Sequence, residues 1–280
     1  MKRMKIAILV ISVIAFVILL IFALDLRLLT RFYKLESDKI SSKVRIALVT
    51  DLHSCSYGEG QRTLVDAIDA QSPDIVLLGG DIFDDRIKDY GTELFLKAIS
   101  NKYPCYYVAG NHEYYCGKIY FEEKMEMLRK YGVEVITGKT VELYINGEYI
   151  NLCGADDPDS FYFPEDSDAD DFSLQLPGLS KIAENGHFTL LLSHRPEYFD
   201  SYSQYGFDLV LAGHAHGGQW RIPYLLNGLF APHQGIFPKY AGGSYEKNGL
   251  TMIVSRGLAR ETTIVPRIFN RPELVIVDIE

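Results

Sequence analysis

The sequence predicts an α/β domain that follows one apolar helix. In the first half of the chain, short runs of Val, Ile, Leu and Ala alternate with stretches of helical periodicity, and each run ends in a polar motif. Before them, residues 6–24 contain no charged side chain. The chain has 280 residues, of which 48% are hydrophobic, so one large core can form without a split into two domains.

The apolar segment at residues 6–24 is a candidate membrane span. At about 1.5 Å per residue, its 19 residues would form a helix of roughly 28 Å, close to the hydrocarbon thickness of a bilayer. No cleavage motif of small residues follows it, which favours an uncleaved anchor over a removed signal peptide. A helix buried in a soluble core would show a polar face, and this segment has none.

The charges beside the span predict its orientation. Lys2, Arg3 and Lys5 favour a cytoplasmic N-terminus, whereas five basic residues between positions 27 and 43 favour the opposite. A short basic tail before an apolar stretch is typical of a signal anchor. We therefore expect a single-pass membrane protein whose catalytic domain lies outside the cytoplasm.

The predicted organisation has three parts. Residues 1–25 form the basic tail and the transmembrane anchor, residues 26–43 form a juxtamembrane linker, and residues 44–280 form the folded domain. The linker mixes charged and apolar side chains. Two interpretations of it remain open, a segment that lies on the membrane surface and an ordinary connector.

The elements of the first half recur at a fixed interval. We expect strands at residues 44–50, 74–78 and 105–109, with helices at residues 60–70 and 91–100 between them. The polar motifs that end these strands begin at Asp51, Asp81 and Asn111, each separated from the next by 30 residues. That interval is the length of a strand–helix–strand unit, so two consecutive crossovers would bring the three motifs to one sheet edge. Ligands collect at such edges.

The second half of the chain is predicted to form mainly strands. An Asn-Gly pair at 146–147 separates two apolar runs and predicts a hairpin. Further strands are expected at residues 187–193, 207–212, 250–255 and 273–278. The acidic and aromatic segment at residues 156–171 has two open interpretations, a solvated loop and a flap over the site with its aromatic side chains facing substrate.

Charge and cysteine content exclude several functions. The formal net charge is −9 and no Lys/Arg-rich block follows the N-terminus, so no nucleic-acid partner is expected. The four cysteines show no zinc-binding spacing, which predicts buried side chains in place of ligands or disulfides. His187 and His233 stand alone in the sequence and are interpreted as structural or solvated.

The polar motifs predict a metal site. Seven carboxylate, amide and imidazole side chains follow the predicted strands: Asp51, His53, Asp81, Asn111, His194, His214 and His216. This mixture suits Mn²⁺, Fe or Zn²⁺ better than Ca²⁺. Seven ligands would crowd one ion, so we expect two divalent ions with Asp81 as a bridge and with room for water. Ions about 3.5–4 Å apart can hold a bridging hydroxide that attacks phosphorus.

The joint pattern resembles the signature of the calcineurin-like metallophosphoesterases. It comprises Asp51-x-His53, Gly80-Asp81-x-x-Asp84, Gly110-Asn111-His112-Glu113, His194 and Gly213-His214-x-His216, and the resemblance covers about residues 44–278. It implies an α/β/β/α sandwich of two stacked β-sheets flanked by helices. The segments around Ser193-His194-Arg195-Pro196 and Gln219 look closest to the membrane-anchored bacterial branch, whose relatives include enzymes that cleave the pyrophosphate of UDP-diacylglucosamine.

The resemblance also implies residue roles. Asp51, His53 and His216 would hold one metal, while Asn111, His194 and His214 would hold the other, with Asp81 bridging. His112 would lie near the leaving group as a general acid or charge stabiliser, oriented by Asp84. The phosphoprotein phosphatases of this superfamily have Arg directly after that second Asp, whereas Asp85 intervenes before Arg86 in this chain. This departure argues against a protein phosphatase.

The sequence thus predicts a membrane-anchored hydrolase with a phosphate-ester or pyrophosphate substrate. The substrate is expected in a lipid or cell-envelope precursor, because the anchor confines the site near lipid headgroups. Two alternatives remain. A phosphomonoesterase or nucleotidase would use the same metal site with another pocket. A non-catalytic scaffold would keep the fold, but it would be expected to have lost ligands, and all seven are present.

Overall fold

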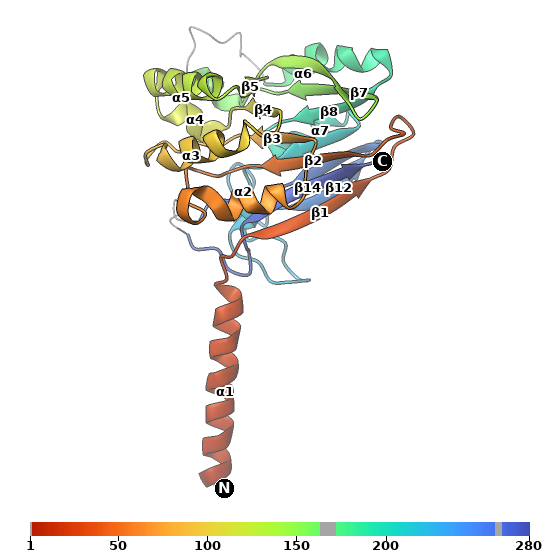
Figure 1. The fold of residues 1–280 in the computed structure, drawn as a ribbon. Helices are drawn as coiled ribbons and strands as arrows, with labels where there is room; N and C mark the ends of the chain where they lie inside the picture. Colours follow the sequence, from red (N-terminus) through yellow and green to blue (C-terminus); the bar gives the residue numbers. More distant parts are fainter. Residues whose placement is uncertain (1, 163–171, 261–264) are drawn as a thin grey trace.

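The computed structural model describes residues 2–162, 172–260 and 265–280. An apolar helix, α1 (Lys2–Ala23), projects from a folded domain whose first strand is β1 (Leu29–Leu35) (Figure 1). The predicted acidic and aromatic segment at residues 156–171 is described only as far as residue 162. Whether its later part covers the site therefore falls outside the described residues.

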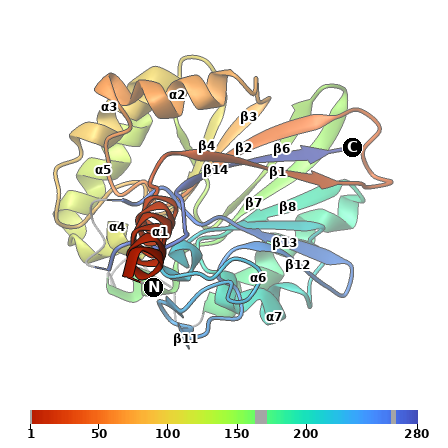
Figure 2. The ribbon, with the colours of Figure 1, turned by 90° about the horizontal axis from the view of Figure 1, so that it is seen from below.

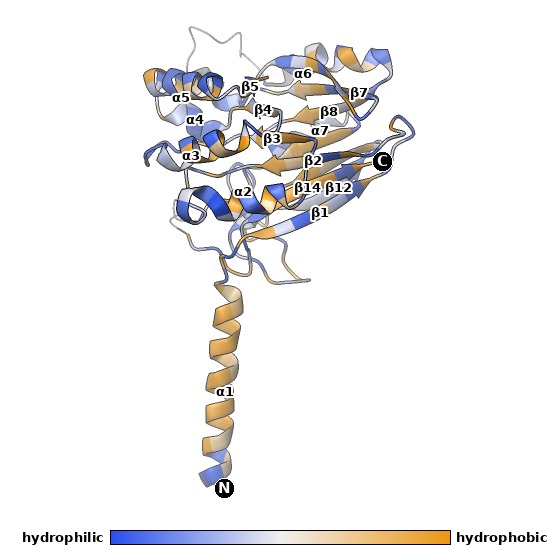
Figure 3. Cartoon of the chain, viewed as in Figure 1, coloured by the Kyte–Doolittle hydropathy of each residue, from blue (hydrophilic) through white to orange (hydrophobic). Residues whose placement is uncertain are grey.

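The α1 helix is apolar along nearly its whole length (Figure 3). Among the described residues it is the one helix, of 22 residues, that is long and apolar enough to cross a membrane. A signal sequence near the N-terminus has the same properties. The predicted apolar segment is thus helical, and its insertion in a membrane stays a prediction.

The first sheet contains the three predicted parallel strands. In order across the sheet, its strands are β1, β14 (Glu273–Ile279), β2 (Val44–Val49), β3 (Ile75–Gly79), β4 (Cys105–Val108) and β5 (Glu134–Val135). Strands β2, β3, β4 and β5 are mutually parallel. Helices α2 (Arg62–Asp69) and α3 (Tyr90–Ile99) connect the first three, so the two predicted crossovers are confirmed.

The second sheet has six strands as well. In order they are β12 (Gly243–Lys247), β13 (Leu250–Val254), β9 (Leu209–Ala212), β8 (Phe188–Leu192), β7 (Glu148–Gly154) and β6 (Lys139–Ile145). Strands β6 and β7 form the predicted antiparallel hairpin. Its turn residues Asn146 and Gly147 have φ values of 53° and 92°, the left-handed backbone that a tight hairpin turn requires.

Alternating side chains show how the layers pack. In β2, Ile46 and Leu48 enter a buried cluster between the two sheets, while Ala47 and Val49 pack under helices. The helices on that side are α2, α3 and α5 (Lys118–Lys130), and those on the far side of the second sheet are α6 (Phe172–Ser180) and α7 (Phe199–Tyr202) (Figure 2). The α/β/β/α sandwich of two stacked sheets is therefore confirmed.

Strand β1 corrects the prediction of a linker at residues 26–43. Leu29 to Leu35 pair in parallel with β14, from Leu29 opposite Glu273 to Leu35 opposite Ile279. Tyr33 and Leu35 pack against the cluster between the sheets. Lys34 lies on the exposed face of this edge strand, and Arg31 lies 3.7 Å from buried Glu273, so the charges of this stretch concealed its pairing.

The remaining elements are short. They are η1 (Glu59–Gln61), α4 (Asn111–Tyr115), η2 (Pro158–Tyr162), η3 (Lys181–Asn185), η4 (Pro196–Tyr198), η5 (His216–Gly218), β10 (Phe230–Ala231) and β11 (Gly235–Ile236). Of these, α4 begins directly after β4 and η5 directly after the corner that follows β9. Both elements carry residues of the candidate site.

Candidate metal centre

The seven predicted donors meet at the carboxyl ends of parallel strands from both sheets. Strands β2 and β3 lead into Asp51, His53 and Asp81, β4 into Asn111, and strands β8 and β9 into His194, His214 and His216. Every one of the seven is at most 6% exposed. The structure thus brings together all of the donors that the sequence predicted.

Backbone strain concentrates at these corners. Five donors have positive φ: Asp51 (51°), His53 (47°), Asp81 (51°), His214 (67°) and His216 (47°). For a residue other than glycine this conformation carries about 1–3 kcal/mol, and such strain gathers at functional sites. Glycines make room for the turned side chains, since a Cβ atom on Gly213 or Gly257 would lie 2.7 or 2.5 Å from Asp51 Oδ2.

The donors form two adjoining groups. Ligand atoms of Asp51, His53 and His216 lie within 4.8 Å of one another, and so do those of Asp81, His194 and His214. Asp81 Oδ2 is 3.1 Å from His194 Nε2 in its own group and 3.6 Å from His53 Nε2 in the other. Asp81 therefore lies between the groups, where a bridging ligand would stand.

Four of the predicted donor atoms are buried without a hydrogen bond. They are His53 Nε2, Asp81 Oδ2, Asn111 Oδ1 and His216 Nδ1. A buried polar atom left in this way destabilises a fold by about 1–3 kcal/mol. Nitrogen and oxygen lone pairs that converge without partners fit divalent cations, which would satisfy all four at once.

Burial and charge set the protonation of the imidazoles. Burial, reinforced by nearby Arg195, lowers the pKa of His214 well below its usual value, and burial together with His53 does the same for His216. For His194, burial also acts to lower the pKa, but the carboxylates of Asp81 and Asp51 outweigh it and raise the pKa to about 10. Metal and proton therefore compete for His194, whereas His214 and His216 are neutral and ready to bind.

Outer hydrogen bonds orient the inner donors. His53 Nδ1 donates to Asp84 Oδ2 at 3.0 Å, and His194 Nδ1 donates to the carbonyl of Gly79 at 2.8 Å. In both rings Nδ1 is thereby engaged, which leaves Nε2 as the nitrogen turned toward the other donors. Fully buried Glu113 accepts from the backbone N–H groups of Asp81, Phe83 and Gly110, which ties the β3 and β4 corners together.

The predicted partner of His112 is wrong. His112 Nδ1 lies 2.6 Å from Asp85 Oδ1, while Asp84 is engaged with His53. The physical reason is the start of α4 at Asn111, which places His112 in the first turn of a helix. The helix places His112 N–H 2.9 Å from Asp81 Oδ1 and its ring over Asp85.

A buried arginine supports the second group from behind. Arg195 is 1% exposed and donates to both oxygens of Asp157, at 2.7 and 2.8 Å, and to Asp159 Oδ2 at 2.7 Å. Its Nη1 atom also lies 2.6 Å from His233 Nδ1, which is 2.9 Å from His214 Nε2. The same Nη1 atom lies 3.2 Å from His214 Nε2, so the guanidinium contacts both imidazoles.

Arg195 and His233 were not predicted as parts of the site. A lone histidine has no spacing that marks it, and His233 was interpreted as structural or solvated. Two features of the sequence could have predicted a buried ion pair here. They are the acidic residues at 156–159 and the arginine that directly follows the donor His194. Asp157 and Asp159 are buried in the structure. This part of the acidic segment therefore holds Arg195 in place beside the site and is not a solvated loop. The hydroxyls of Tyr114 and Tyr115 donate to Asp156 and Asp159, which joins these acidic residues to α4.

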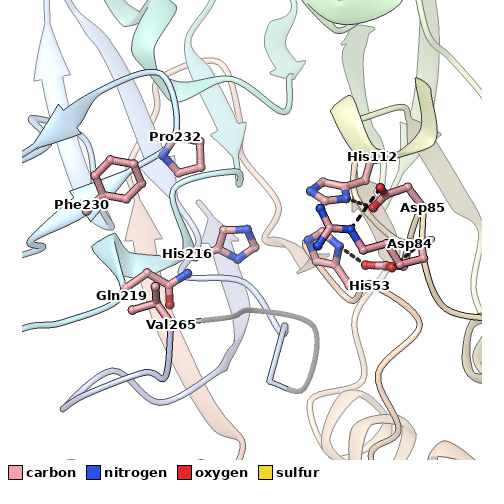
Figure 4. A pocket seen from close by; sticks show the side chains of 10 residues that line it. His53, Asp84, Asp85, His112, His216, Gln219, Phe230, Pro232 and Val265 are labelled. Atoms are coloured by element: carbon pink, nitrogen blue, oxygen red, sulfur yellow. Dashed lines mark hydrogen bonds and ion pairs between the residues drawn. The ribbon is translucent and has the colours of Figure 1, made fainter. Parts of the chain in front are cut away.

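A pocket opens beside the donors. Figure 4 shows His53, Asp84, Asp85 and His112 on one side and Gln219, Phe230, Pro232 and Val265 on the other, with His216 between them. Arg86 also lines the pocket. One wall is therefore polar and charged, and the opposite wall is largely apolar.

Comparison with known proteins identifies the family. Residues 44–218 match the model of the calcineurin-like phosphoesterases, and the chain belongs to this family. An uncharacterized metallophosphoesterase of Helicobacter pylori is 32% identical over 225 residues, which are 79% of this chain and 55% of that protein. One of Aquifex aeolicus is 28% identical over 256 residues, 89% of this chain and 90% of that protein. The chain thus spans about half of the first relative and most of the second.

Solved structures share the fold. A dimetal phosphatase from Danio rerio aligns with a TM-score of 0.50 at 13% identity, over 77% of this chain and 88% of that one. GAP50, described as the anchor in the inner membrane complex of Plasmodium, aligns with a TM-score of 0.51 at 11% identity, over 85% and 81%. Proteins of the family are metallophosphoesterases, hydrolases that use divalent metals and act on phosphate esters.

Proposed function

We propose that the chain is a membrane-anchored phosphoesterase that hydrolyses a phosphodiester or pyrophosphate bond with two divalent ions, Mn, Fe or Zn. The observation that carries the proposal is the pair of adjoining donor groups that meet at Asp81. In this proposal Asp51, His53 and His216 hold one ion. Asn111, His194 and His214 hold the other, and Asp81 bridges.

The unpartnered atoms support this assignment. His53 Nε2 and His216 Nδ1 belong to the first group and Asp81 Oδ2 to the second, and buried Asn111 Oδ1 is the further donor that the proposal assigns to the second ion. Bound ions would supply charge neutralisation for phosphate oxygens and a water of lowered pKa. The protein's own contribution is to hold the donors rigidly in a dry corner, with tautomers fixed by Asp84 and the Gly79 carbonyl.

His112 is placed to handle the leaving group. Its Nδ1 is held by Asp85, and its side chain lines the pocket with 25% of its surface exposed. The other ring nitrogen is then the one that faces substrate. In this proposal a protonated His112 donates to the departing oxygen, and Asp85 stabilises the imidazolium and fixes its ring. Arg86, on the same rim, meets the remaining negative charge of the substrate.

The α1 helix supports the membrane part of the proposal. It projects from the domain as a separate apolar rod, and its end is joined to the domain by a hydrogen bond from Phe269 N–H to the Ala23 carbonyl at 2.7 Å (Figure 1). An anchor confines the site to the neighbourhood of lipid headgroups. A phosphoester in a lipid or envelope precursor, with the domain outside the cytoplasm, is the substrate that fits this position.

A substrate panel tests the proposal. Full-length chain in detergent, supplied with Mn²⁺, should hydrolyse soluble aryl phosphodiesters or pyrophosphates faster than the matching monoesters. Chelation should abolish activity, and added Mn²⁺ should restore it. Faster hydrolysis of monoesters would replace the proposal with a phosphomonoesterase or nucleotidase. Inactivity toward every ester while two ions remain bound would favour a non-catalytic scaffold.

A further inference from the structure

The loops between the site and the C-terminal strands expose a group of large apolar side chains. Six of them, which we call the apolar ledge, are Trp220, Ile222, Tyr224, Leu225, Ile236 and Phe237, and their exposed fractions run from 41% to 107%. Soluble surfaces rarely gather this many large apolar groups in one place unless the place is a binding surface.

Backbone hydrogen bonds make the ledge one surface. Ile222 N–H donates to the Leu226 carbonyl at 3.0 Å, which closes the turn that carries Tyr224 and Leu225. Phe237 N–H donates to the Leu229 carbonyl at 2.8 Å, so the second part of the ledge lies against the same loop.

The ledge lies next to the end of α1. Phe269, whose N–H bonds the Ala23 carbonyl, follows Ile268, and Ile268 pairs with Trp220 in a β-bridge. The Ile268 carbonyl also accepts from Arg221 N–H at 2.9 Å. Two hydrogen-bonded steps therefore connect the last turn of α1 to the first residues of the ledge. The light-blue loops that carry the ledge lie on the α1 side of the domain in both views (Figures 1 and 2).

The composition of the ledge fits the boundary layer of a bilayer. Trp and Tyr are enriched at the level of the lipid headgroups, because their rings are apolar and their polar atoms can stay hydrated or paired. Trp220 Nε1 donates to the Pro266 carbonyl at 3.0 Å, which pins the indole while 41% of the residue remains exposed. Beside it, Leu225 and Tyr224 supply the apolar contact.

The ledge continues into the pocket. Phe230, which lines the apolar wall, stands opposite Ile236 of the ledge in the β10–β11 pair. Gln219, which also lines the pocket, directly precedes Trp220. An apolar path thus leads from the side where α1 enters the domain to the wall that faces His112.

We infer that the apolar ledge rests in the headgroup layer of the membrane that holds α1, and that the pocket draws its phosphoester from a lipid of that same layer. The inference rests on the proposed phosphoesterase function, because it names the substrate class of that site. A lipid whose apolar part stays in the bilayer would present its phosphate across Phe230 and Pro232 to the polar wall.

The chain carries its own probe of docking, since Trp220 is its single tryptophan. We would reconstitute full-length protein in phosphatidylcholine–phosphatidylglycerol vesicles with and without brominated acyl chains. Docking predicts that brominated lipid quenches Trp220 emission and that iodide does not reach the indole. Emission quenched by iodide and unaffected by brominated lipid would overturn the inference. So would protection from both quenchers, which would place a second copy of the chain on the ledge.

A pair of esters with one leaving group tests the substrate class. Ethyl para-nitrophenyl phosphate is soluble, and hexadecyl para-nitrophenyl phosphate enters vesicles. The variant Leu225→Ser/Phe237→Ser should lose about tenfold in rate on the hexadecyl ester, because two apolar contacts with the bilayer are removed. Its rate on the ethyl ester should match the wild type, since neither residue lines the pocket.

The control variant is Ile119→Ser/Tyr120→Ser. These side chains are 73% and 61% exposed on α5, which lies away from α1 (Figure 1). The control should change neither rate nor Trp220 quenching. Equal rates of the ledge variant and the wild type on the hexadecyl ester would overturn the inference while leaving the proposed function intact. Inactivity of the wild type toward both esters would instead refute the proposed function, and the quenching result would still decide whether the ledge docks.

Discussion

On one wall of the pocket His53 is 2% exposed, and His216, between the walls, is 6% exposed; each has an unpartnered nitrogen atom. On the other wall, Phe230 and Val265 are 49% and 44% exposed. The first wall consists of strand ends held by an outer layer of hydrogen bonds, and the second of loop residues from the last quarter of the chain. We therefore expect the chemistry to depend on the first wall and the choice of substrate on the second.

The largest effect is expected at Asp81. As the ligand shared by both groups, Asp81→Ala should reduce hydrolysis to background and lower bound metal more than any other single change. Glu126→Ala, which removes an exposed carboxylate on α5, is the matched control and should change neither quantity. Metal analysis that still finds two ions per chain in the Asp81 variant would contradict the bridging role.

The next effect separates His112 from the donors beside it. His112→Ala should leave metal content near the wild-type value and reduce turnover by about 10²–10⁴-fold, because a general acid is lost. The loss should shrink for a good leaving group such as nitrophenolate, which needs no proton as its bond breaks. His187→Ala, a partly exposed histidine in the loop before β8, should have no effect.

The leaving-group series decides the role of His112. A loss that is uniform over leaving groups of rising pKa would exclude proton donation and leave an electrostatic contact to phosphate. A lost metal ion would make His112 a ligand.

The adjacent residues Asp84 and Asp85 give a sharper test of the polar wall. Asp84→Asn acts on His53 Nδ1 and should weaken metal affinity by about 10–100-fold, the usual effect of removing an outer carboxylate. Asp85→Asn acts on His112 and should lower turnover without a change in metal affinity. Titration of metal-free protein with Mn²⁺, followed by rates at saturating metal, separates the two. If Asp84→Asn lowered turnover alone and Asp85→Asn weakened metal affinity, the prediction from the sequence that Asp84 orients His112 would be correct.

The polar wall was predictable because each of its metal donors is marked by the residues directly before it in the sequence. Each donor directly follows an apolar run, so sequence order alone places Asp51, Asp81 and Asn111 at one sheet edge. The partner of His112 was not predictable, because the choice between two neighbouring carboxylates depends on where α4 begins. Arg195 and His233 come from separate loops whose meeting point is a matter of tertiary structure.

The edges of the fold were equally hard to predict. Strand β1 carries Arg31 and Lys34, and these charges concealed a seven-residue pairing with β14. The apolar wall comes from Phe230, Pro232 and Val265, around which no periodic pattern marks a pocket. The sequence therefore predicted the donors and the layers, while the residues of the apolar wall were found only in the structure.

The smallest effect is expected on the apolar wall. Phe230→Ala should leave metal content and the turnover of ethyl para-nitrophenyl phosphate unchanged. It should raise KM for an ester with a long alkyl tail by about tenfold. The half-exposed ring of Phe230 would contribute about 1.4 kcal/mol of apolar contact to the binding of the tail, and this contact is lost in the variant. Steady-state rates on both esters provide the test. A fall in turnover on the small ester would show that this wall takes part in the chemistry, and the contrast between the walls would fail.

Electron paramagnetic resonance of the Mn²⁺-loaded full-length chain tests the central claim most directly. Two Mn²⁺ ions that share Asp81 lie close enough for their spins to couple. Titration should therefore end at two ions per chain with a coupled signal, and Asp81→Ala should abolish that coupling. A titration that ends at one ion, or a spectrum of isolated Mn²⁺ at full occupancy, would contradict a centre in which Asp81 joins two ions.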